Sequence, residues 1–312
     1  MNRTTLITQL FQKSHLLTMH NPAYQKTVDS LFAWLITSDH THNDITSLSL
    51  SNKTSINALI QARQNMTLAG LEEIEFLLNK YPKISFKKTK TDGQKIKKGE
   101  GIAILTGDTY TILSLERIIL NILGRMTGIA TQTNKFTQIL KNSPFIAATR
   151  KTPWMLLDKK AVAVGGGLTH RLNLSDGYLY KDNHLQILKN QYNLKTEAQA
   201  VAHALANITT DKNSFIEIEV NTRESIPAAI EILSKKPNQN GIIMLDNWNS
   251  KETKEFIKNT KTNPNYSRIL FEASGNINEE NLKDWSLSGV DVISSGALTH
   301  SSKNADLSME FN

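Results

Sequence analysis

Five cations gather within a short stretch in the middle of the chain, on segments rich in glycine and short polar residues. They are Arg150, Lys151, His170, Arg171 and Lys181. Such segments are typical of strand ends and loops rather than of a solvated helix face. A guanidinium group binds carboxylates and phosphates through two parallel hydrogen bonds, and an ammonium group offers phosphate a compact positive charge. The stretch therefore predicts a binding site for a ligand with several negative charges.

Carboxylates and small residues occur at the ends of the later apolar runs. Glu219 and Asp246 stand at two such ends, where a pair of carboxylates can hold a Mg²⁺ ion that also takes phosphate oxygens. Glu217 lies two residues from Glu219 on the same strand face, so alternation alone does not decide between them. Backbone N–H groups after the last two runs favour phosphate binding. The residues at those two places are Ser274, Gly275, Ser295 and Gly296.

Short apolar runs separated by polar tips and helical patterns position these residues. The runs begin at Phe145, Gly177, Phe215, Gly241, Arg268 and Val290. Their starts are about 22 to 38 residues apart, the room that a helix and two loops require. The pattern favours a parallel α/β barrel, with an open doubly wound sheet as the alternative. No Gly-x-Gly-x-x-Gly follows the first run, which counts against a dinucleotide site.

The first half of the chain mixes helical and strand patterns and is typical of a smaller α/β domain. Apolar spacing predicts helices over residues 23–37 and 71–78, and strands over residues 54–63, 84–90 and 102–106. The longest helical pattern spans residues 114–140 and links the halves. Within it, Arg117 follows Glu116 in an apolar run, where an arginine is either paired with a carboxylate or held as a ligand-facing cation. The sequence leaves both interpretations open.

The composition limits the chemistry and the partners. The chain has 312 residues, no cysteine and a formal net charge of +7. The absence of cysteine excludes disulfides, thiolate metal sites and thiol nucleophiles. The positive charge fits nucleic acid, a membrane surface or a phosphorylated metabolite, but the lysine-rich runs lack the interleaved aromatic residues of a nucleic-acid platform. Because neither a signal peptide nor an apolar run of membrane-spanning length is evident, we expect a soluble, cytoplasmic protein without a nucleic-acid or membrane partner.

An ordered series of motifs runs through both halves. In the second half it comprises Thr149–Thr152, Ala161–Arg171, Leu174–Gly177, Lys181–His184, Glu217–Val220, Met244–Asn247, Glu272–Gly275 and Gly296–Ser301. In the first half it comprises Asn43–Ser47, Ala62–Arg63, Leu68–Leu71, Glu116–Arg117 and Thr127–Thr131. Together these motifs resemble those of quinolinate phosphoribosyltransferase, also called nicotinate-nucleotide pyrophosphorylase (carboxylating). The resemblance covers nearly the whole chain beyond about residue 25.

The resemblance implies the fold and the reaction of a type II phosphoribosyltransferase. It implies an α/β protein with an amino-terminal open-faced α/β sandwich over residues 1–125, completed by the tail 299–312, and a TIM-like α/β barrel over residues 126–298. It also implies a homodimer whose active site takes residues from both subunits. The implied reaction converts quinolinate and phosphoribosyl diphosphate, with Mg²⁺, to nicotinate mononucleotide, CO₂ and diphosphate, a step of NAD biosynthesis.

The resemblance also implies a role for each candidate residue. The carboxylates of quinolinate would be held by Arg150, His170 and Arg171, with Arg117 supplied across the dimer interface. The donor phosphates would meet Lys151 and Lys181, and the 5′-phosphate would bind at Ser274, Gly275, Ser295 and Gly296. Glu219 and Asp246 would face the ribose and bind Mg²⁺, and together with Lys151 they are the residues expected to act in catalysis.

The chain departs from the usual family pattern in three places. Pro153-Trp154-Met155 follows Thr152 in a loop that is about two residues shorter and lacks one expected cation. Asn276 replaces the second glycine of Glu-Ala-Ser-Gly-Gly, and Asn43 replaces a usual glycine before Asp44. We expect these changes to alter affinity or loop mobility and not the type of reaction. Two alternatives stay open: a related phosphoribosyltransferase with another pyridine or heterocyclic acceptor, and a nucleic-acid-binding or structural protein that keeps the fold without the chemistry.

Overall fold

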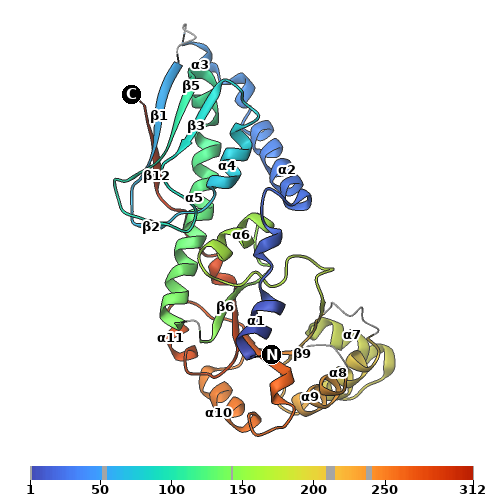
Figure 1. The fold of residues 1–312 in the computed structure, drawn as a ribbon. Helices are drawn as coiled ribbons and strands as arrows, with labels where there is room; N and C mark the ends of the chain where they lie inside the picture. The colour runs from blue at the N-terminus through green and yellow to red at the C-terminus, as the bar shows by residue number, and fades with distance from the viewer. Residues whose placement is uncertain (1, 51–54, 142, 209–214, 237–240, 312) are drawn as a thin grey trace. The chain divides into compact units, whose positions relative to one another are not determined.

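A computed structural model describes residues 2–50, 55–141, 143–208, 215–236 and 241–311, and Figure 1 colours them along the chain. The chain divides into two compact units. The parallel-sheet unit comprises Met1–Lys13, Phe136–Lys151 and Leu168–Ala297. The antiparallel-sheet unit comprises Ser14–Lys135, Thr152–Gly167 and Leu298–Asn312. This division groups residues 1–13, 126–135, 152–167 and 298 differently from the predicted domains 1–125 and 126–298, which stay a prediction.

The antiparallel-sheet unit is built on four strands in the order β12-β1-β5-β3. Each neighbouring pair is antiparallel, and along β1 the alternate residues Ala58, Ile60 and Ala62 are fully buried, as the period of two in a strand requires. The strands are β1 (Ser55–Ala62), β3 (Ile84–Lys88), β5 (Gly101–Asp108) and β12 (Leu307–Phe311), with a small pair β2 (Met66–Thr67) and β4 (Lys95–Ile96). The helices are η1 (Ser14–Leu16), α2 (Pro22–Ser38), η2 (Thr41–Asn43), α3 (Ile45–Leu48), α4 (Leu71–Leu78) and α6 (Leu156–Val164).

The predicted long helix is α5 (Thr109–Leu140), which begins earlier than expected because Asp108 caps its first turn. The carboxylate of Asp108 accepts hydrogen bonds from the backbone N–H and the hydroxyl of Thr111, at 3.0 and 2.7 Å. Further along α5, a Cβ on Gly128 would lie 2.1 Å from the carbonyl oxygen of Lys303. Only glycine permits this approach, and the segment that packs there continues into β12, which pairs with β1.

The parallel-sheet unit contains six strands in the order β6-β11-β10-β9-β8-β7, and all neighbours are parallel. They are β6 (Phe145–Ala148), β7 (Tyr178–Tyr180), β8 (Ile216–Val220), β9 (Gly241–Asp246), β10 (Ile269–Ser274) and β11 (Val292–Ser295). The helices are α1 (Arg3–Phe11), α7 (Asp182–Tyr192), α8 (Glu197–Ala206), α9 (Ser225–Lys235), α10 (Ser250–Thr260), η3 (Tyr266–Arg268), α11 (Leu282–Trp285) and η4 (Gly296–Leu298), which ends in the other unit. Every predicted strand of this half is confirmed, within two residues at its start.

Helix α1 shows that these strands curve around a common interior. Its apolar residues Leu6, Ile7, Leu10 and Phe11 belong to one buried cluster. Residues from β6, β9, β10 and β11 and the residue before β8 join that cluster: Ala147, Phe215, Ile242, Leu270 and Val292. Side chains of five neighbouring strands can meet one helix only if the sheet curls. Together with the antiparallel sheet of the other unit, this arrangement confirms the predicted α/β class with a barrel-like parallel sheet.

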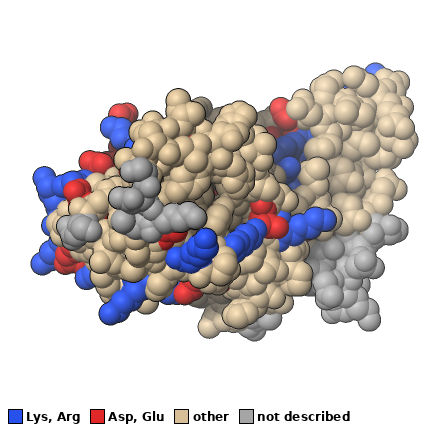
Figure 2. Space-filling model, turned by 90° about the horizontal axis from the view of Figure 1, so that it is seen from above, with Lys and Arg blue, Asp and Glu red and all other residues tan. Residues whose placement is uncertain are grey.

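The surface and the helices add two observations about partners. No helix among the described residues is both long and apolar enough to span a bilayer. On the face shown in Figure 2, Lys and Arg side chains stand in separate groups with Asp and Glu among them. A continuous basic stripe, which a nucleic-acid backbone would need, is not seen among the described residues on that face.

Candidate active site

A cavity of about 520 Å³ lies at the carboxyl ends of the strands in the parallel-sheet unit. Side-chain alternation brings two residues from each of four successive strands or their tips into it. They are Leu179 and Lys181, Glu217 and Glu219, Met244 and Asp246, and Glu272 and Ser274. Glu217 and Glu219 therefore both line the cavity, which resolves the question that alternation left open.

Most of the predicted site residues meet in this cavity. Those that line it are Arg150, Lys151, His170, Arg171, Lys181, Glu219, Asp246, Ser274 and Gly275. Arg117, Ser295 and Gly296 are not among the described residues that line it. Arg117 is exposed on α5 in the antiparallel-sheet unit, and the buried Ser295 hydroxyl donates to the carbonyl oxygen of Ile277 at 2.5 Å. Gly296 begins η4.

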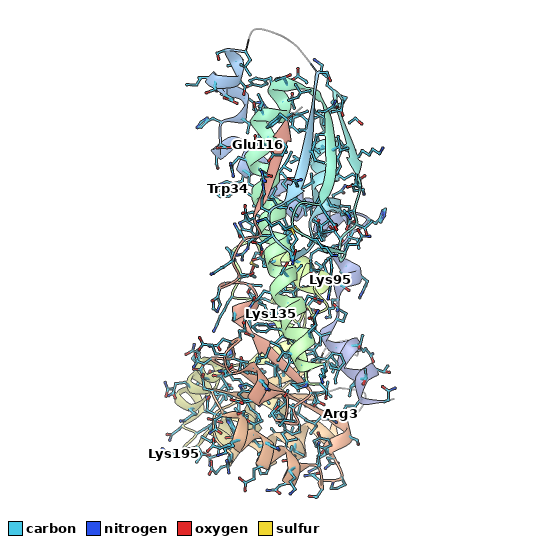
Figure 3. All side chains as sticks on the ribbon, turned by 90° about the vertical axis from the view of Figure 1, so that its left-hand side faces the viewer. Arg3, Trp34, Lys95, Glu116, Lys135 and Lys195 are labelled. Carbon is cyan, nitrogen blue, oxygen red and sulfur yellow. The ribbon has the colours of Figure 1, made fainter. Side chains whose placement is uncertain are left out.

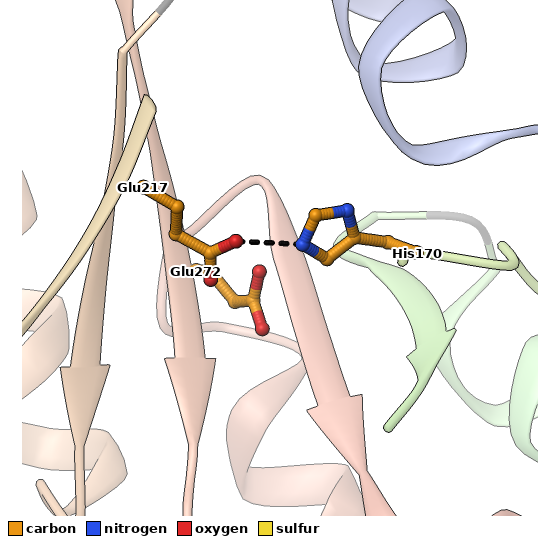
Figure 4. A group of neighbouring side chains, drawn as sticks. All are labelled: His170, Glu217 and Glu272. Carbon is orange, nitrogen blue, oxygen red and sulfur yellow. Dashed lines mark hydrogen bonds and ion pairs between the residues drawn. The ribbon is translucent and has the colours of Figure 1, made fainter. Parts of the chain in front are cut away.

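Three neighbouring side chains contact the imidazole ring of His170. It is 6% exposed, and its ring contacts those of Phe11 and Phe215, with ring centroids 4.6 and 4.8 Å away. Its Nε2 forms a 2.6 Å hydrogen bond with a carboxylate oxygen of Glu217 (Figure 4). The two aromatic contacts fix the plane of the imidazole, and the hydrogen bond fixes its rotation within that plane.

Glu217 and Glu272 form, with His170, the floor of the cavity. Figure 4 shows the Glu272 carboxyl group beside that of Glu217. Burial raises the pKa of Glu217 to about 8 and, together with the negative charge of Glu217, raises the pKa of Glu272 to about 8. Candidate ligand atoms of the three residues lie within 4.8 Å of one another, so the floor is also a geometrically possible metal site.

Two guanidinium groups converge above the floor. Arg171 is buried, and its Nη1 donates to the carbonyl oxygen of Gly177 at 3.0 Å. Burial, followed by the positive charge of Arg150, lowers the pKa of Arg171. Cations that repel one another in this way are stabilised by a bound anion, so this part of the cavity suits a carboxylate ligand.

Lys181, Glu219 and Asp246 form the mouth of the cavity. The Nζ atom of Lys181 donates to a carboxylate oxygen of Glu219 at 2.9 Å. Burial alone would lower the pKa of Lys181, but the hydrogen bond and charge of Glu219 raise it. Burial, followed by the charge of Glu219, raises the pKa of Asp246. The mouth therefore places two carboxylates close enough to repel each other, beside one lysine.

The turn after β10 contains two successive residues with positive φ angles, Gly275 and Asn276. Gly275 has φ +98°, and a Cβ there would lie 2.4 Å from the Oδ1 atom of Asn247. Asn276 follows with φ +51°, a left-handed conformation that asparagine tolerates better than most residues. Its side chain donates to Asn247 at 3.3 Å. The substitution of the usual glycine at 276 is thus compatible with the local backbone.

The loop after Thr152 ends in an unusual conformation. The backbone N–H of Lys151 donates to the Thr149 hydroxyl at 3.1 Å, before the chain enters Pro153-Trp154-Met155. Met155 has φ +46° and ψ −112°, and α6 begins at the next residue. A residue with a side chain is strained in this region of backbone space, so the backbone strain of this loop lies at Met155.

The comparisons with known proteins agree with this geometry. The family model described as "Quinolinate phosphoribosyl transferase, C-terminal domain" matches residues 129–310, and its N-terminal counterpart matches residues 44–127. The chain belongs to this family.

Named relatives of the family extend over most of the chain. A "Probable nicotinate-nucleotide pyrophosphorylase (carboxylating)" of Methanocaldococcus jannaschii is 36% identical over 262 residues, which are 81% of this chain and 85% of that protein. The protein of the same description from Bacillus subtilis is 36% identical over 274 residues, 86% of this chain and 87% of that protein. A solved structure of the nicotinate-nucleotide pyrophosphorylase from Francisella tularensis has a TM-score of 0.78 and 30% identity, covering 92% of this chain and 96% of that one.

Two features of this family member were missed by the sequence analysis. Glu272 has no role among the predicted site residues, although its position two residues before Ser274 on a buried strand predicts the same inward face. Helix α1, with Phe11 against His170, was not predicted at all. Its low amphipathicity gave little signal, and it lies outside the residues that the family models match.

Proposed function

We propose that the chain transfers the phosphoribosyl group of phosphoribosyl diphosphate to quinolinate, giving nicotinate mononucleotide, CO₂ and diphosphate. The observation that carries this proposal is the division of one cavity into a cationic inner part and a carboxylate-bearing mouth, in a chain of the quinolinate phosphoribosyl transferase family. The substrates are small, charged and water-soluble, which fits the cytoplasmic location expected from the sequence and calls for neither nucleic acid nor membrane.

The acceptor would bind in the inner part of the cavity. Quinolinate carries two carboxylates on one ring, and planar guanidinium groups grip such a dicarboxylate in one orientation better than lysines do. Arg150 and Arg171 supply two such groups, and His170 adds an imidazole whose orientation is fixed by Glu217. These three residues would place the ring nitrogen toward the ribose.

The donor would bind at the mouth. Lys151 and Lys181 line the same cavity and would neutralise the phosphates that leave as diphosphate. Ser274 and Gly275 lie at the turn after β10, where backbone N–H groups suit the 5′-phosphate, and Ser295 and Gly296 would complete that subsite from the end of β11. The buried Ser295 hydroxyl already binds Ile277, so we assign its role to the backbone.

Mg²⁺ would be held by Glu219 and Asp246. The raised pKa of Asp246, caused by burial and by Glu219, indicates two carboxylates whose repulsion a divalent cation relieves. Mg²⁺ prefers oxygen ligands and keeps several waters, so the mouth suits it better than the buried floor, where a histidine is one of three candidate ligands. When bound, the ion supplies charge neutralisation for the leaving diphosphate.

The chemistry needs positioning and electrostatics, and no covalent nucleophile. As the C–O bond to diphosphate breaks and the C–N bond to the pyridine nitrogen forms, positive charge develops on the ribose, which the carboxylates of Glu219 and Asp246 stabilise. The alkylated ring nitrogen is then a cation next to the C2 carboxylate. Loss of CO₂ leaves a carbanion at C2 that this nitrogen stabilises and that takes a proton from water to give nicotinate mononucleotide. The residues around the acceptor orient and desolvate the carboxylate that leaves.

Arg117 would reach the cavity of a second copy in a homodimer. It is exposed on α5, and Ser114, one turn earlier, contacts Asp44 at the start of α3. Around this region four apolar side chains are more than half exposed: Trp34 at 61%, Ile45 at 82%, Leu48 at 61% and Leu50 at 53% (Trp34 is labelled in Figure 3). Exposed apolar patches mark contact surfaces, which supports an interface near Arg117.

A complementation experiment tests the shared site. Arg117→Ala and Lys151→Ala are each expected to be inactive, whereas a dimer mixed from the two variants has one site with neither change. Mixing the purified variants should therefore restore up to about a quarter of the wild-type rate, because random pairing makes half of the dimers mixed. If no mixture of the two variants regains activity while wild type runs as a dimer in ultracentrifugation, the proposed sharing is wrong.

The activity itself is tested with two acceptors. The protein is incubated with Mg²⁺, phosphoribosyl diphosphate and either quinolinate or nicotinate, and mononucleotide and CO₂ are measured. We expect product from quinolinate. Product from nicotinate alone would favour the related phosphoribosyltransferase with another acceptor, and turnover of neither, with salt-sensitive binding to DNA or RNA, would favour the non-enzymatic alternative.

A further inference from the structure

The amino-terminal helix α1 is anchored to the parallel-sheet unit at its first turn. The Arg3 guanidinium forms an ion pair with Asp291, with Nη2 2.7 Å from Oδ2, and donates to the carbonyl oxygens of Tyr266 and Ile269 at 3.1 and 2.8 Å. It also lies 4.2 Å from the centre of the Tyr266 ring. Arg3 is labelled in Figure 3. These bidentate and stacked contacts fix where the helix begins.

The middle of α1 is buried in the interior of the same unit. Leu6, Ile7 and Leu10 are each less than 10% exposed and share a cluster with residues from neighbouring strands. A helix that is pinned at its first residue and has one face buried has little freedom to slide or rotate. Its last residues are therefore placed at a fixed point beneath the cavity.

That fixed point is the segment that carries His170 and Arg171. Phe11 is fully buried with its ring against the imidazole of His170, and its carbonyl oxygen accepts the backbone N–H of Thr169 at 3.0 Å. The backbone N–H of Lys13 donates to the Thr169 hydroxyl at 2.8 Å. The Lys13 ammonium pairs with Asp176, whose other oxygen accepts the backbone N–H of Leu172 at 2.8 Å.

We infer that Phe11 and Lys13 are positioning residues for the acceptor, which hold His170 and Arg171 in place from both sides along the chain. The inference rests on the proposed function for its substrate but on the contacts above for its geometry. Glu217 restrains the imidazole at Nε2. The plane of the ring depends on the two phenyl groups, of which Phe215 belongs to the sheet and Phe11 to α1.

The first test compares Phe11→Leu with Leu6→Ala. Both remove buried volume from α1, but only the first removes the ring that contacts His170. We expect Phe11→Leu to raise KM for quinolinate about 3- to 10-fold, the size of a lost aromatic contact, with KM for phosphoribosyl diphosphate unchanged. Leu6→Ala should lower Tm at least as much and leave both KM values near wild type. Lys13→Met should act like Phe11→Leu, more weakly.

A double-mutant cycle asks whether Phe11 acts through His170. In a His170→Ala background the additional effect of Phe11→Leu on KM for quinolinate should vanish, because coupled residues are not additive. An undiminished effect in that background would overturn the inference, as would equal changes in both KM values.

A measurement without turnover separates the inference from the proposed function. Long-range ¹H–¹⁵N spectra of the histidine rings, with His170 assigned from His170→Ala, report the ring in the free protein. Its signals should shift or broaden in Phe11→Leu and stay unchanged in Leu6→Ala. If the His170 signals are unchanged in Phe11→Leu, the inference is wrong, even if the protein turns over quinolinate. Changed signals in a protein that does not turn over quinolinate would support the positioning contact and reject the substrate.

Discussion

The floor and the mouth of the cavity each carry two carboxyl groups, but the surroundings of the two pairs differ. On the floor, Glu217 and Glu272 are essentially inaccessible to water, and burial raises the pKa of each to about 8. At the mouth, Glu219 has the Lys181 ammonium at 2.9 Å, and Asp246 is only half-buried. The carboxyl groups of the floor are therefore favoured in their protonated form at neutral pH, whereas the mouth has the ammonium group of Lys181 beside its carboxylates.

The difference shows how one strand can serve two purposes. Glu217 and Glu219 are two residues apart on β8 and share a face, so secondary structure does not distinguish them. Their partners do, because the Lys181 ammonium donates to the carboxylate of Glu219, whereas the carboxyl group of Glu217 is hydrogen-bonded to His170. We assign the floor to holding His170 in place, and the mouth to the charges of the donor and the metal.

The largest expected effect is at the mouth. Asp246→Asn keeps the shape of the side chain and removes its charge, so kcat should fall about 100- to 1000-fold, as when a preorganised electrostatic group is lost. Steady-state kinetics over a range of Mg²⁺ concentrations measure this. Asp284 is an exposed aspartate on α11, so Asp284→Asn is the matched control and should leave kcat unchanged. A tenfold loss or less at saturating Mg²⁺ would reject a catalytic role for Asp246.

On the floor the expected effect is on stability and its pH dependence. Because the pKa of Glu272 is raised from 4.5 to about 8 in the folded protein, its neutral form is compatible with folding, and the cost of ionising it grows as pH rises. The unfolding free energy of wild type should fall relative to Glu272→Gln between pH 4.5 and about 8, by up to about 1.4 kcal/mol per pH unit. Denaturant unfolding across pH 4 to 9 tests this, and parallel curves for the two proteins would contradict it.

A smaller effect is expected for the lysine of the mouth. Lys181→Met retains the apolar stem and removes the charge, so KM for phosphoribosyl diphosphate should rise about tenfold, the value of a charged hydrogen bond. KM for quinolinate should stay within about twofold of wild type if donor and acceptor subsites are separate. Lys195→Met, an exposed lysine labelled in Figure 3, serves as the control. A larger rise in KM for quinolinate than for the donor would show that the subsites are wrongly divided.

The smallest effect is expected at the phosphate turn. Asn276 has φ +51° and makes one long hydrogen bond, at 3.3 Å, to Asn247. Asn276→Gly restores the usual family residue, which adopts the same backbone conformation freely, so KM for the donor should change by less than about threefold. Kinetics with the donor varied measure it, and a tenfold change would mean that the asparagine side chain itself contacts the phosphate.

Much of the parallel-sheet unit could be predicted because its strands are short, apolar and separated by polar tips. Because ligands bind at the carboxyl ends of barrel strands, Lys181, Asp246 and Ser274 could be predicted there, and all three line the cavity. The pattern could not rank Glu217 against Glu219, since depth along the barrel axis depends on how neighbouring strands are staggered. Ser295, also at a strand end, turned its hydroxyl to Ile277 and away from the cavity, which only the tertiary packing decides.

The contribution of α1 could not be predicted for a different reason. Its residues Leu6, Ile7, Leu10 and Phe11 pack in a curved interior that is built almost entirely by residues more than 130 positions later. Local periodicity carries no information about such a distant partner. The same holds for Arg117, whose exposure on α5 agrees with a ligand-facing cation and for which no carboxylate partner is recorded among the described residues.

Because β12 pairs with β1, the antiparallel sheet cannot be completed until nearly the whole chain has been synthesised. β1 ends at residue 62 and β12 begins at residue 307, so the ribosome produces three strands of the antiparallel sheet long before the fourth. Until then one edge of β1 is open, and an open strand edge is a template for pairing with another chain. A nascent chain that stalls before residue 307 would contain all the residues that line the cavity, but its antiparallel sheet would lack β12. Such a chain would be prone to aggregate on the polysome through the open edge of β1.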